Sequence, residues 1–211
     1  MDAFISKQTD SSALRSHPWT TMESDQSNVY VDFKKSPKLI RSAIEDLIPL
    51  KKWSFVDTFY ELIVWINSPQ ALLESNDCSF NVVEDNHDAQ YPYAKKCSGR
   101  LMILFRDVAE NCQQRSVDWL MQEILQSVAT TKLGFKAGAI ALSQNPTCYL
   151  ALGDQPNTGG MGQQLVLTFF AYGKNERRCY ESMQQVLEHA HSCLVKVNKK
   201  ISTGELDAIY N

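Results

Sequence analysis

The chain has 211 residues, of which 44% are hydrophobic and 21% are charged, and its formal net charge is −3. This balance is typical of an ordinary globular domain and excludes a fibrous or wholly disordered protein. A weakly acidic chain lacks the surplus of Lys and Arg with which proteins bind nucleic-acid phosphates, so no direct nucleic-acid binding is expected.

No run of the sequence reaches the roughly 18 apolar residues that a membrane-spanning helix requires, and residues 1–10 lack the apolar centre of a secretory signal. We therefore expect a cytoplasmic protein without a membrane partner. The six cysteines are Cys78, Cys97, Cys112, Cys148, Cys179 and Cys193. They show no CxxC spacing, which predicts buried or idle thiols rather than a zinc site or a dense disulfide framework. No metal and no cofactor are expected.

Residues 1–27 are rich in Ser, Thr, Gln and Asp and contain few large apolar side chains. Such a composition cannot offset the entropy of ordering the chain, so the segment is predicted to be a flexible arm. Within it, His17, Pro18 and Trp19 form the part best able to anchor the arm, because Trp19 offers the largest apolar area. Two outcomes stay open: the arm orders only against a partner, or it folds back on its own domain.

Residues 28–84 are predicted to be a helical region. A short strand is expected at 29–33, where apolar and polar residues alternate. A helix should follow at about 37–48, beginning at Ser36-Pro37 and ending at Pro49, which has no amide proton to continue it.

A second helix is predicted to begin at Ser54, which forms a capping-box pattern with Asp57, and to continue to Ile66. Its aromatic and β-branched content makes a pair of strands the alternative. A further short helix is expected at about 70–74. Residues 84–99 collect polar residues, Pro and Gly without periodicity, which predicts a loop.

Residues 100–197 carry the sharper pattern and are expected to form the core of sheet and helices. The predicted elements are a strand at 100–106, a helix at 116–129, strands at 137–142, 147–152 and 163–172, and a long helix that Asn175 caps and that runs to about 197. This order predicts an α+β fold, a mostly antiparallel sheet flanked by helices, in one domain spanning 28–211.

The glycine-rich stretch at 153–162 is the most distinctive part of the sequence. A phosphate-binding loop would lead from a strand into the N-terminus of a helix, but this stretch leads into another strand. It is therefore predicted to be a hairpin loop that serves contact with a partner. The candidate interaction residues are Trp19, Asp154, Gln155, Asn157 and Met161.

Asp107, Glu110 and Asp118 follow the first buried strand of the core and are the best acid–base candidates, because strand ends often line clefts. Helix capping and solvent exposure explain them equally well. They define the alternative function, a small-molecule-binding domain or enzyme with an acidic cleft near Asp107 and Asp154. No cysteine, serine or histidine lies in a recognisable nucleophile signature, so no catalytic residue is predicted.

Three stretches together resemble tail-terminator proteins of tailed bacteriophages: YLALGD at 149–154, QQLVLTF at 163–169, and the amphipathic helix at 177–194. The resemblance covers about a quarter of the chain. Residues 28–90 have no counterpart in compact members of that family, and the strand at 100–106 carries no matching motif.

The resemblance implies an α+β subunit that assembles into a ring joining the tail tube to the neck, so it acts by assembly and not by catalysis. It implies a homo-oligomer with other assembly proteins as partners, located in the host cytoplasm and then in the virion. The expected function is therefore that of a non-enzymatic structural or assembly subunit.

Overall fold

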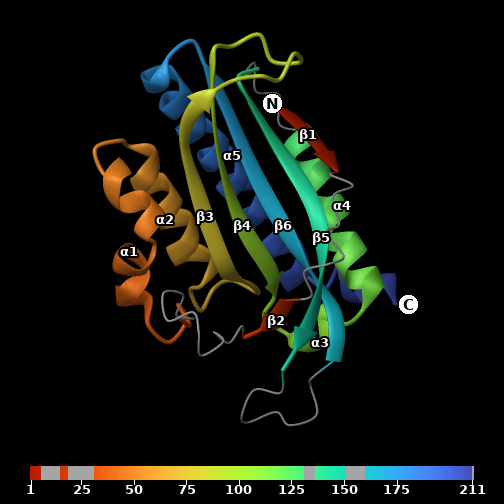
Figure 1. The fold of residues 1–211 in the computed structure, drawn as a ribbon. Coiled ribbons are helices and arrows are strands. Elements are labelled where there is room, and N and C mark those ends of the chain that lie inside the picture. The colour runs from red at the N-terminus through yellow and green to blue at the C-terminus, as the bar shows by residue number, and fades with distance from the viewer. Residues whose placement is uncertain (6–14, 19–30, 131–135, 151–159, 211) are drawn as a thin grey trace.

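A computed structural model describes residues 1–5, 15–18, 31–130, 136–150 and 160–210 of the chain. Its centre is one mixed sheet with helices packed against one face (Figure 1). The strands are β1 (Asp2–Ile5), β2 (Arg15–His17), β3 (Leu73–Asp85), β4 (Lys95–Phe105), β5 (Gly138–Tyr149) and β6 (Gly160–Gly173). Their order is β1-β5-β6-β4-β3, and β2 also pairs with β5.

The helices come from the regions between and after these strands. They are α1 (Ile40–Ala43), α2 (Phe55–Ile66), α3 (Val108–Asn111), α4 (Gln114–Thr130) and α5 (Glu176–Ser202), with 3₁₀ turns at Pro37–Leu39, Glu45–Leu50 and Asp207–Ile209. The four long strands pair antiparallel, whereas β1 and β2 run parallel to β5. The predicted α+β class, a mostly antiparallel sheet flanked by helices, is confirmed.

Two similar units make up the sheet and its main helices. In each unit a pair of neighbouring strands precedes a long helix: β3 and β4 precede α4, and β5 and β6 precede α5. The second strands of the two units, β4 and β6, pair in the middle of the sheet. This repeated topology has no counterpart in the sequence, which shows no internal repeat.

The long C-terminal helix follows its prediction. The side chain of Asn175 caps α5 by accepting a hydrogen bond of 3.0 Å from the backbone N–H of Arg178. The apolar stripe, buried as predicted, contains Tyr180, Met183, Val186, Leu187, Ala190, Leu194 and Val197. This stripe packs against the core-facing side chains of the sheet, such as Leu167 and Phe169 of β6. No helix within the described ranges combines the length and the apolar character needed to cross a lipid bilayer.

Residues 31–99 differ from their prediction. The helix that begins after Ser54 is confirmed as α2, but the short helix expected at 70–74 is wrong, because β3 begins at Leu73 and pairs with β4. The expected loop at 84–99 is shorter, since β4 begins at Lys95. The helix expected at 37–48 is broken at Ile44, whose ψ of 84° is not helical. Of the strand expected at 29–33, residues 31–33 are not a strand, and residues 29–30 lie outside the described residues.

The strands expected at 137–142 and 147–152 are parts of one strand, β5, and residues 151–152 lie outside the described residues. No turn forms at 143–146, because β5 stays in register with β6 throughout, including the pair Pro146–Gln163. Pro146 lies between Leu142, the last residue that pairs with β1, and Thr147, the first that pairs with β2. A long partner strand therefore overrides the local turn signal.

The described parts of the N-terminal segment lie on the sheet. β1 and β2 occupy the outer edge of β5, and the Tyr91 hydroxyl donates a hydrogen bond of 2.7 Å to the Asp2 carboxylate. Here the chain folds back on its own domain, which is the second of the two outcomes left open by the sequence. Residues 6–14 and 19–27 of the predicted arm lie outside the described residues.

Candidate functional site

Of the five candidate interaction residues, Met161 is described. It is the second residue of β6, pairs with Cys148 of β5, and is 58% exposed. Trp19, Asp154, Gln155 and Asn157 lie outside the described residues. Met161 and the last pair of the ladder, Tyr149–Gly160, therefore mark the end of the β5–β6 hairpin at which the candidate residues were expected.

At this hairpin end, buried and exposed side chains alternate. Thr147 and Tyr149 are buried, while the next residue after β5, Leu150, is 40% exposed. Successive side chains of a strand point to opposite faces, so Leu150 lies on the face opposite Tyr149. The start of α4 reaches β5 at Gln144, whose amide donates to Asp118 at 2.7 Å. Farther along the hairpin, beyond Gln144, the two large apolar side chains of Leu150 and Met161 are exposed.

The other face of the hairpin end is held tightly by α3. A Cβ atom at Gly162 would lie 2.3 Å from the backbone oxygen of Asn111, so only glycine permits this close approach. Asn111 is buried, and its side-chain amide makes two hydrogen bonds of 2.8 Å with the backbone of Phe105, one as donor and one as acceptor. The hairpin end is thus rigid on one face and apolar on the other.

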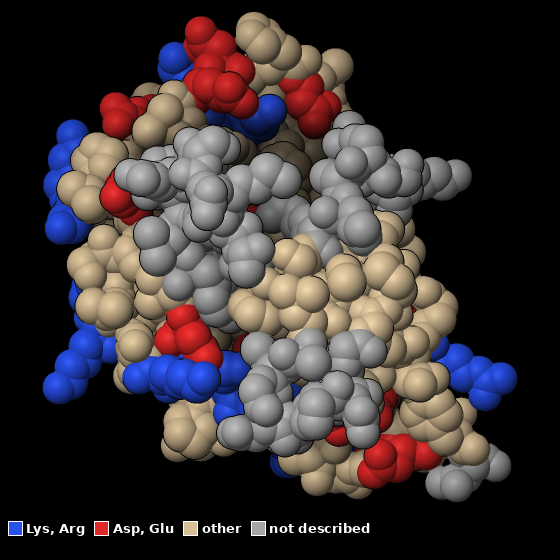
Figure 2. Space-filling model, turned by 60° about the horizontal axis from the view of Figure 1, so that its bottom comes forward, with Lys and Arg blue, Asp and Glu red and all other residues tan. Residues whose placement is uncertain are grey.

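Figure 2 brings the lower end of Figure 1 forward, where β5 ends and β6 begins. Charged side chains of both signs lie around the margin of this view, and a broad area of described surface between them carries no Lys, Arg, Asp or Glu. Depletion of charged side chains is a feature of the central part of protein–protein interfaces, and the described surface in this area has that feature.

The three acid–base candidates do not form one group. Asp107 caps α3 by accepting from the N–H of Ala109. Glu110 accepts from the hydroxyl of Ser116, and Asp118 accepts from the side-chain amides of Gln114 and Gln144. Each carboxylate thus has its own local partner, as the capping and exposure explanation expects.

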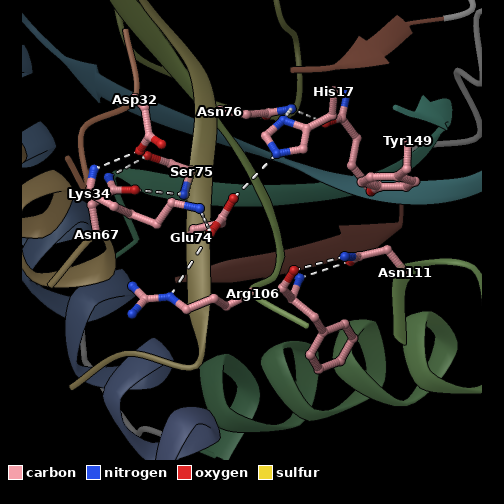
Figure 3. A network of polar contacts seen from close by, with 12 residues as sticks. His17, Asp32, Lys34, Asn67, Glu74, Ser75, Asn76, Arg106, Asn111 and Tyr149 are labelled. Atoms are coloured by element: carbon pink, nitrogen blue, oxygen red, sulfur yellow. Dashed lines mark hydrogen bonds and ion pairs between the residues drawn. The ribbon is translucent and has the colours of Figure 1, made fainter. Parts of the chain in front are cut away.

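A buried polar network that the sequence did not predict lies beside the hairpin end (Figure 3). At its centre is Glu74 of β3, which is 2% exposed. One carboxylate oxygen lies 3.3 Å from Nε2 of His17, and the other accepts from the ammonium of Lys34 and lies 4.0 Å from Nε of Arg106. A buried carboxylate needs such partners, because an unpaired charge in the interior is very costly.

Opposing effects act on the pKa of Glu74. Burial raises the pKa by disfavouring the charged form, but hydrogen bonds from His17 and Lys34, together with the positive charge of Lys34, lower it, and the net result is a pKa below the usual 4.5. Glu74 is therefore held as the carboxylate at neutral pH.

His17 is 1% exposed, and it connects β2 to β3. Its Nδ1 atom lies 3.3 Å from the side-chain nitrogen of Asn76, which can only donate, so Nδ1 accepts and Nε2 carries the hydrogen that is donated to Glu74. The imidazole also contacts the edge of Tyr149, with 5.9 Å between ring centroids. The sequence identified His17 as part of the anchor, and its contacts show how that anchor is made.

Asn76 reaches the network because β3 is irregular at this point. Ser75 pairs with Ile103 and Asp77 with Met102, so Asn76 is the extra residue of a bulge, and bulges redirect side chains. The Asn76 side-chain amide also donates a hydrogen bond of 2.7 Å to the side-chain oxygen of the buried Gln164 of β6. The network therefore joins β2, β3 and β6.

Neighbouring contacts fix the position of the cationic groups. The Asp32 carboxylate accepts a hydrogen bond of 3.0 Å from the backbone N–H of Lys34. This bond stabilises the turn from which the lysine side chain reaches Glu74. Arg106 donates a hydrogen bond of 2.8 Å to the backbone carbonyl of Ser68. The amide of Asn67, at the end of α2, bonds both the hydroxyl and the N–H of Ser75. Side chains from three separate segments, His17, Lys34 and Arg106, thus converge on one buried carboxylate (Figure 3).

Sequence reasoning missed Glu74, Asn76, Gln164 and Asn111. For Glu74 and Asn76 the one available signal was the polar run from Glu74 to Asp77, directly after Ala71, Leu72 and Leu73. Such a run reads equally well as an exposed helix start. Only the strand pairing and the bulge turn it inward.

Chemically, the network has the character of a structural contact that attaches β2 to β3 and β6, here called the latch, and not of a reaction centre. Its groups are buried and paired with one another, and a Glu74 carboxylate ion-paired with cations is a poor proton acceptor. Within the described ranges, no three His, Cys, Asp or Glu side chains lie close enough together to hold a metal ion. The chain matches no protein-family model, no curated protein sequence and no solved structure.

Proposed function

We propose that the protein is a non-enzymatic structural or assembly subunit that contacts neighbouring protein subunits through the end of the β5–β6 hairpin. The observation that carries this proposal is the exposure of Leu150 and Met161, at 40% and 58%, on a hairpin end whose opposite face is fixed by Gly162 and Asn111. A rigid support for exposed apolar side chains lowers the entropy lost on binding, because the contact surface is already ordered.

The more specific form of the proposal follows from the resemblance to phage tail terminators. In that form the subunit belongs to a homo-oligomeric ring with further assembly proteins as partners, first in the host cytoplasm and then in the virion. Closed rings need a heterologous interface, in which one patch meets a different patch on the next copy. The hairpin end would supply one of these patches.

The test compares two substitutions of equal exposure. Met161→Glu places a charge at the hairpin end, whereas Val82→Glu places one on β3 at a residue that is 57% exposed. The mass of each purified protein in solution is measured by light scattering and sedimentation over a range of concentrations. The wild type and Val82→Glu are expected to form the same defined oligomer, and Met161→Glu a folded species of lower mass.

Two results would contradict the proposal. A wild-type protein that stays monomeric at all concentrations would reject the homo-oligomer. An oligomer that Met161→Glu leaves unchanged would exclude the hairpin end as its interface. Circular dichroism of each variant shows that any loss of mass is not a loss of folding.

A further inference from the structure

Two buried cysteines from distant parts of the chain lie in contact. The sulfur atoms of Cys97 on β4 and Cys179 on α5 are 3.3 Å apart, and both residues are at most 1% exposed. Proximity of two thiols is the first requirement for a disulfide.

The sheet and the helix hold this pair in place. Cys97 pairs with Ala171 of β6, whose carbonyl lies 3.2 Å from the sulfur of Cys179. At the end of β6, a Cβ atom on Gly173 would lie 2.4 Å from the backbone nitrogen of Cys179. The backbone of α5 therefore lies directly on the sheet at this point, and its fourth residue, Cys179, faces Cys97.

The remaining movement is small. A disulfide has a sulfur–sulfur bond of about 2.05 Å, so the two atoms must approach by little more than 1 Å. Rotation of the two side chains about χ1 with a slight shift of the first turn of α5 is a change on that scale. The single hydrogen of the Cys179 thiol has two acceptors in the reduced protein, the Cys97 sulfur and the Ala171 carbonyl.

We propose that Cys97 and Cys179 are a redox-sensitive pair that forms a disulfide joining β4 to α5 when the protein meets a low-molecular-weight disulfide oxidant. One protein thiolate attacks a sulfur of the oxidant, forming a mixed disulfide and releasing one thiol. The second protein thiolate attacks the protein sulfur of that mixed disulfide and releases the second thiol. Two electrons pass to the oxidant, and the protons of the two protein thiols end on the two released thiols.

The reaction is slow in the closed protein. The hydrogen bond with Cys179 and, secondly, burial raise the pKa of Cys97 far above its usual value, so little of the reactive thiolate is present. The oxidant reaches the pair through openings of the first turns of α5, and the rate rises with pH. A pair with these properties stays reduced during brief oxidant exposure and closes under sustained exposure.

Oxidised glutathione serves as the test oxidant, at pH 8 and 37 °C for several hours. Trypsin cleavage without reduction yields residues 97–100 and 179–196, and the second peptide also contains Cys193, so the reaction is run in a Cys193→Ser background. We expect these two peptides to be joined, with a loss of about 2 Da. The midpoint of thermal unfolding should rise by roughly 5–15 °C, because the bond closes a long loop in the unfolded chain.

Cys97→Ala and Cys179→Ala are each expected to abolish the linked peptide, while the single variant Cys112→Ala, at a half-buried cysteine elsewhere, should keep it. Where an alanine variant fails to fold, Cys97→Ser replaces it. The proposal is overturned if the folded protein keeps all its thiols, if the 97–100 peptide is joined to a peptide other than 179–196, or if the link forms only in fully denaturing guanidinium.

Discussion

Nε2 of His17 lies 3.3 Å from the carboxylate of Glu74, and both side chains are almost completely shielded from solvent. The two residues belong to strands at different places in the sheet: β2 on the edge of β5, and β3 at the opposite end of the strand order. A short N-terminal strand is thereby fixed to the far side of the sheet by side chains rather than by the β-ladder alone. The stability of this contact depends on the charge of Glu74.

Glu74→Gln should destabilise the protein by about 2–4 kcal/mol, because the substitution removes the negative charge from a buried group that has cationic partners. Glu84→Gln is the matched control on the same strand. Glu84 forms an ion pair with Lys96 at 3.2 Å, but its side chain is 61% exposed, so the expected loss is below about 1 kcal/mol. Urea denaturation of both variants provides the comparison, and equal losses would show that Glu74 contributes no more than a surface charge.

The contribution of Glu74 should depend on pH in a defined direction. Its pKa in the folded protein is lowered from 4.5, so the carboxylate stabilises the fold fully above about pH 4.5 and loses that effect as the pH falls through the folded-state pKa. The difference in unfolding free energy between the wild type and Glu74→Gln should therefore be constant from pH 5.5 to 7 and shrink below pH 4.5. A difference that grows on acidification would contradict the assigned direction of the shift.

The fold class, the α5 helix and the β6 strand were predictable from the sequence because apolar periodicity and local caps determine them. Asn175, for example, is recognisable as a cap from its position before the apolar stripe. The β3 strand was not predictable, since Leu73 and Phe80 gain their buried places only by pairing with β4. Pro146 caused the opposite error: a proline between apolar runs usually marks a turn, so a turn was predicted where β5 is continuous.

The candidate site divides in the same way. His17 and Met161 stood out as an anchor residue and as part of a distinctive stretch of sequence. Glu74, Asn76 and Gln164 could not be identified, because their partners come from segments far apart in the chain. A buried polar residue has no local signature when its hydrogen-bond partners are non-local.

Gly162 and Gly160 belong to the same glycine-rich stretch but should respond differently to substitution. Gly162→Ala would place a methyl group against the backbone of Asn111, so we expect a loss of about 1–3 kcal/mol or more. At Gly160 the nearest atom is the Cys112 sulfur at 3.6 Å, an ordinary contact, so Gly160→Ala should change stability by less than about 0.5 kcal/mol. Thermal unfolding of both variants measures the contrast, and a neutral Gly162→Ala would mean that α3 can move away.

Shortening the hairpin separates folding from assembly. Deleting residues 155–161 and inserting Asn-Gly in their place removes Met161 and shortens the connection, while the ladder from the Thr147–Gly162 pair inward can be kept. The proposed function predicts a folded protein that has lost its oligomer, measured by light scattering beside circular dichroism. A shortened protein that assembles with unchanged size would remove this hairpin from the assembly mechanism.

The variant His17→Ala tests whether the latch attaches the N-terminal segment to the sheet. β2 pairs with β5 over only three residues, so the side-chain contacts of His17 with Glu74 and Asn76 are expected to contribute much of its attachment. Losing about 1–2 kcal/mol of that attachment raises the open population roughly 5–30-fold, and cleavage by trypsin after Arg15 should accelerate by the same factor. His87 is exposed and lies in the connection between β3 and β4, so His87→Ala serves as the control and should leave the rate unchanged. Mass spectrometry of the fragments separates this local effect from general unfolding, because residues 31–130 should be cut no faster than in the wild type. If Arg15 and the core become sensitive together, His17 stabilises the whole domain and does not act as a local latch.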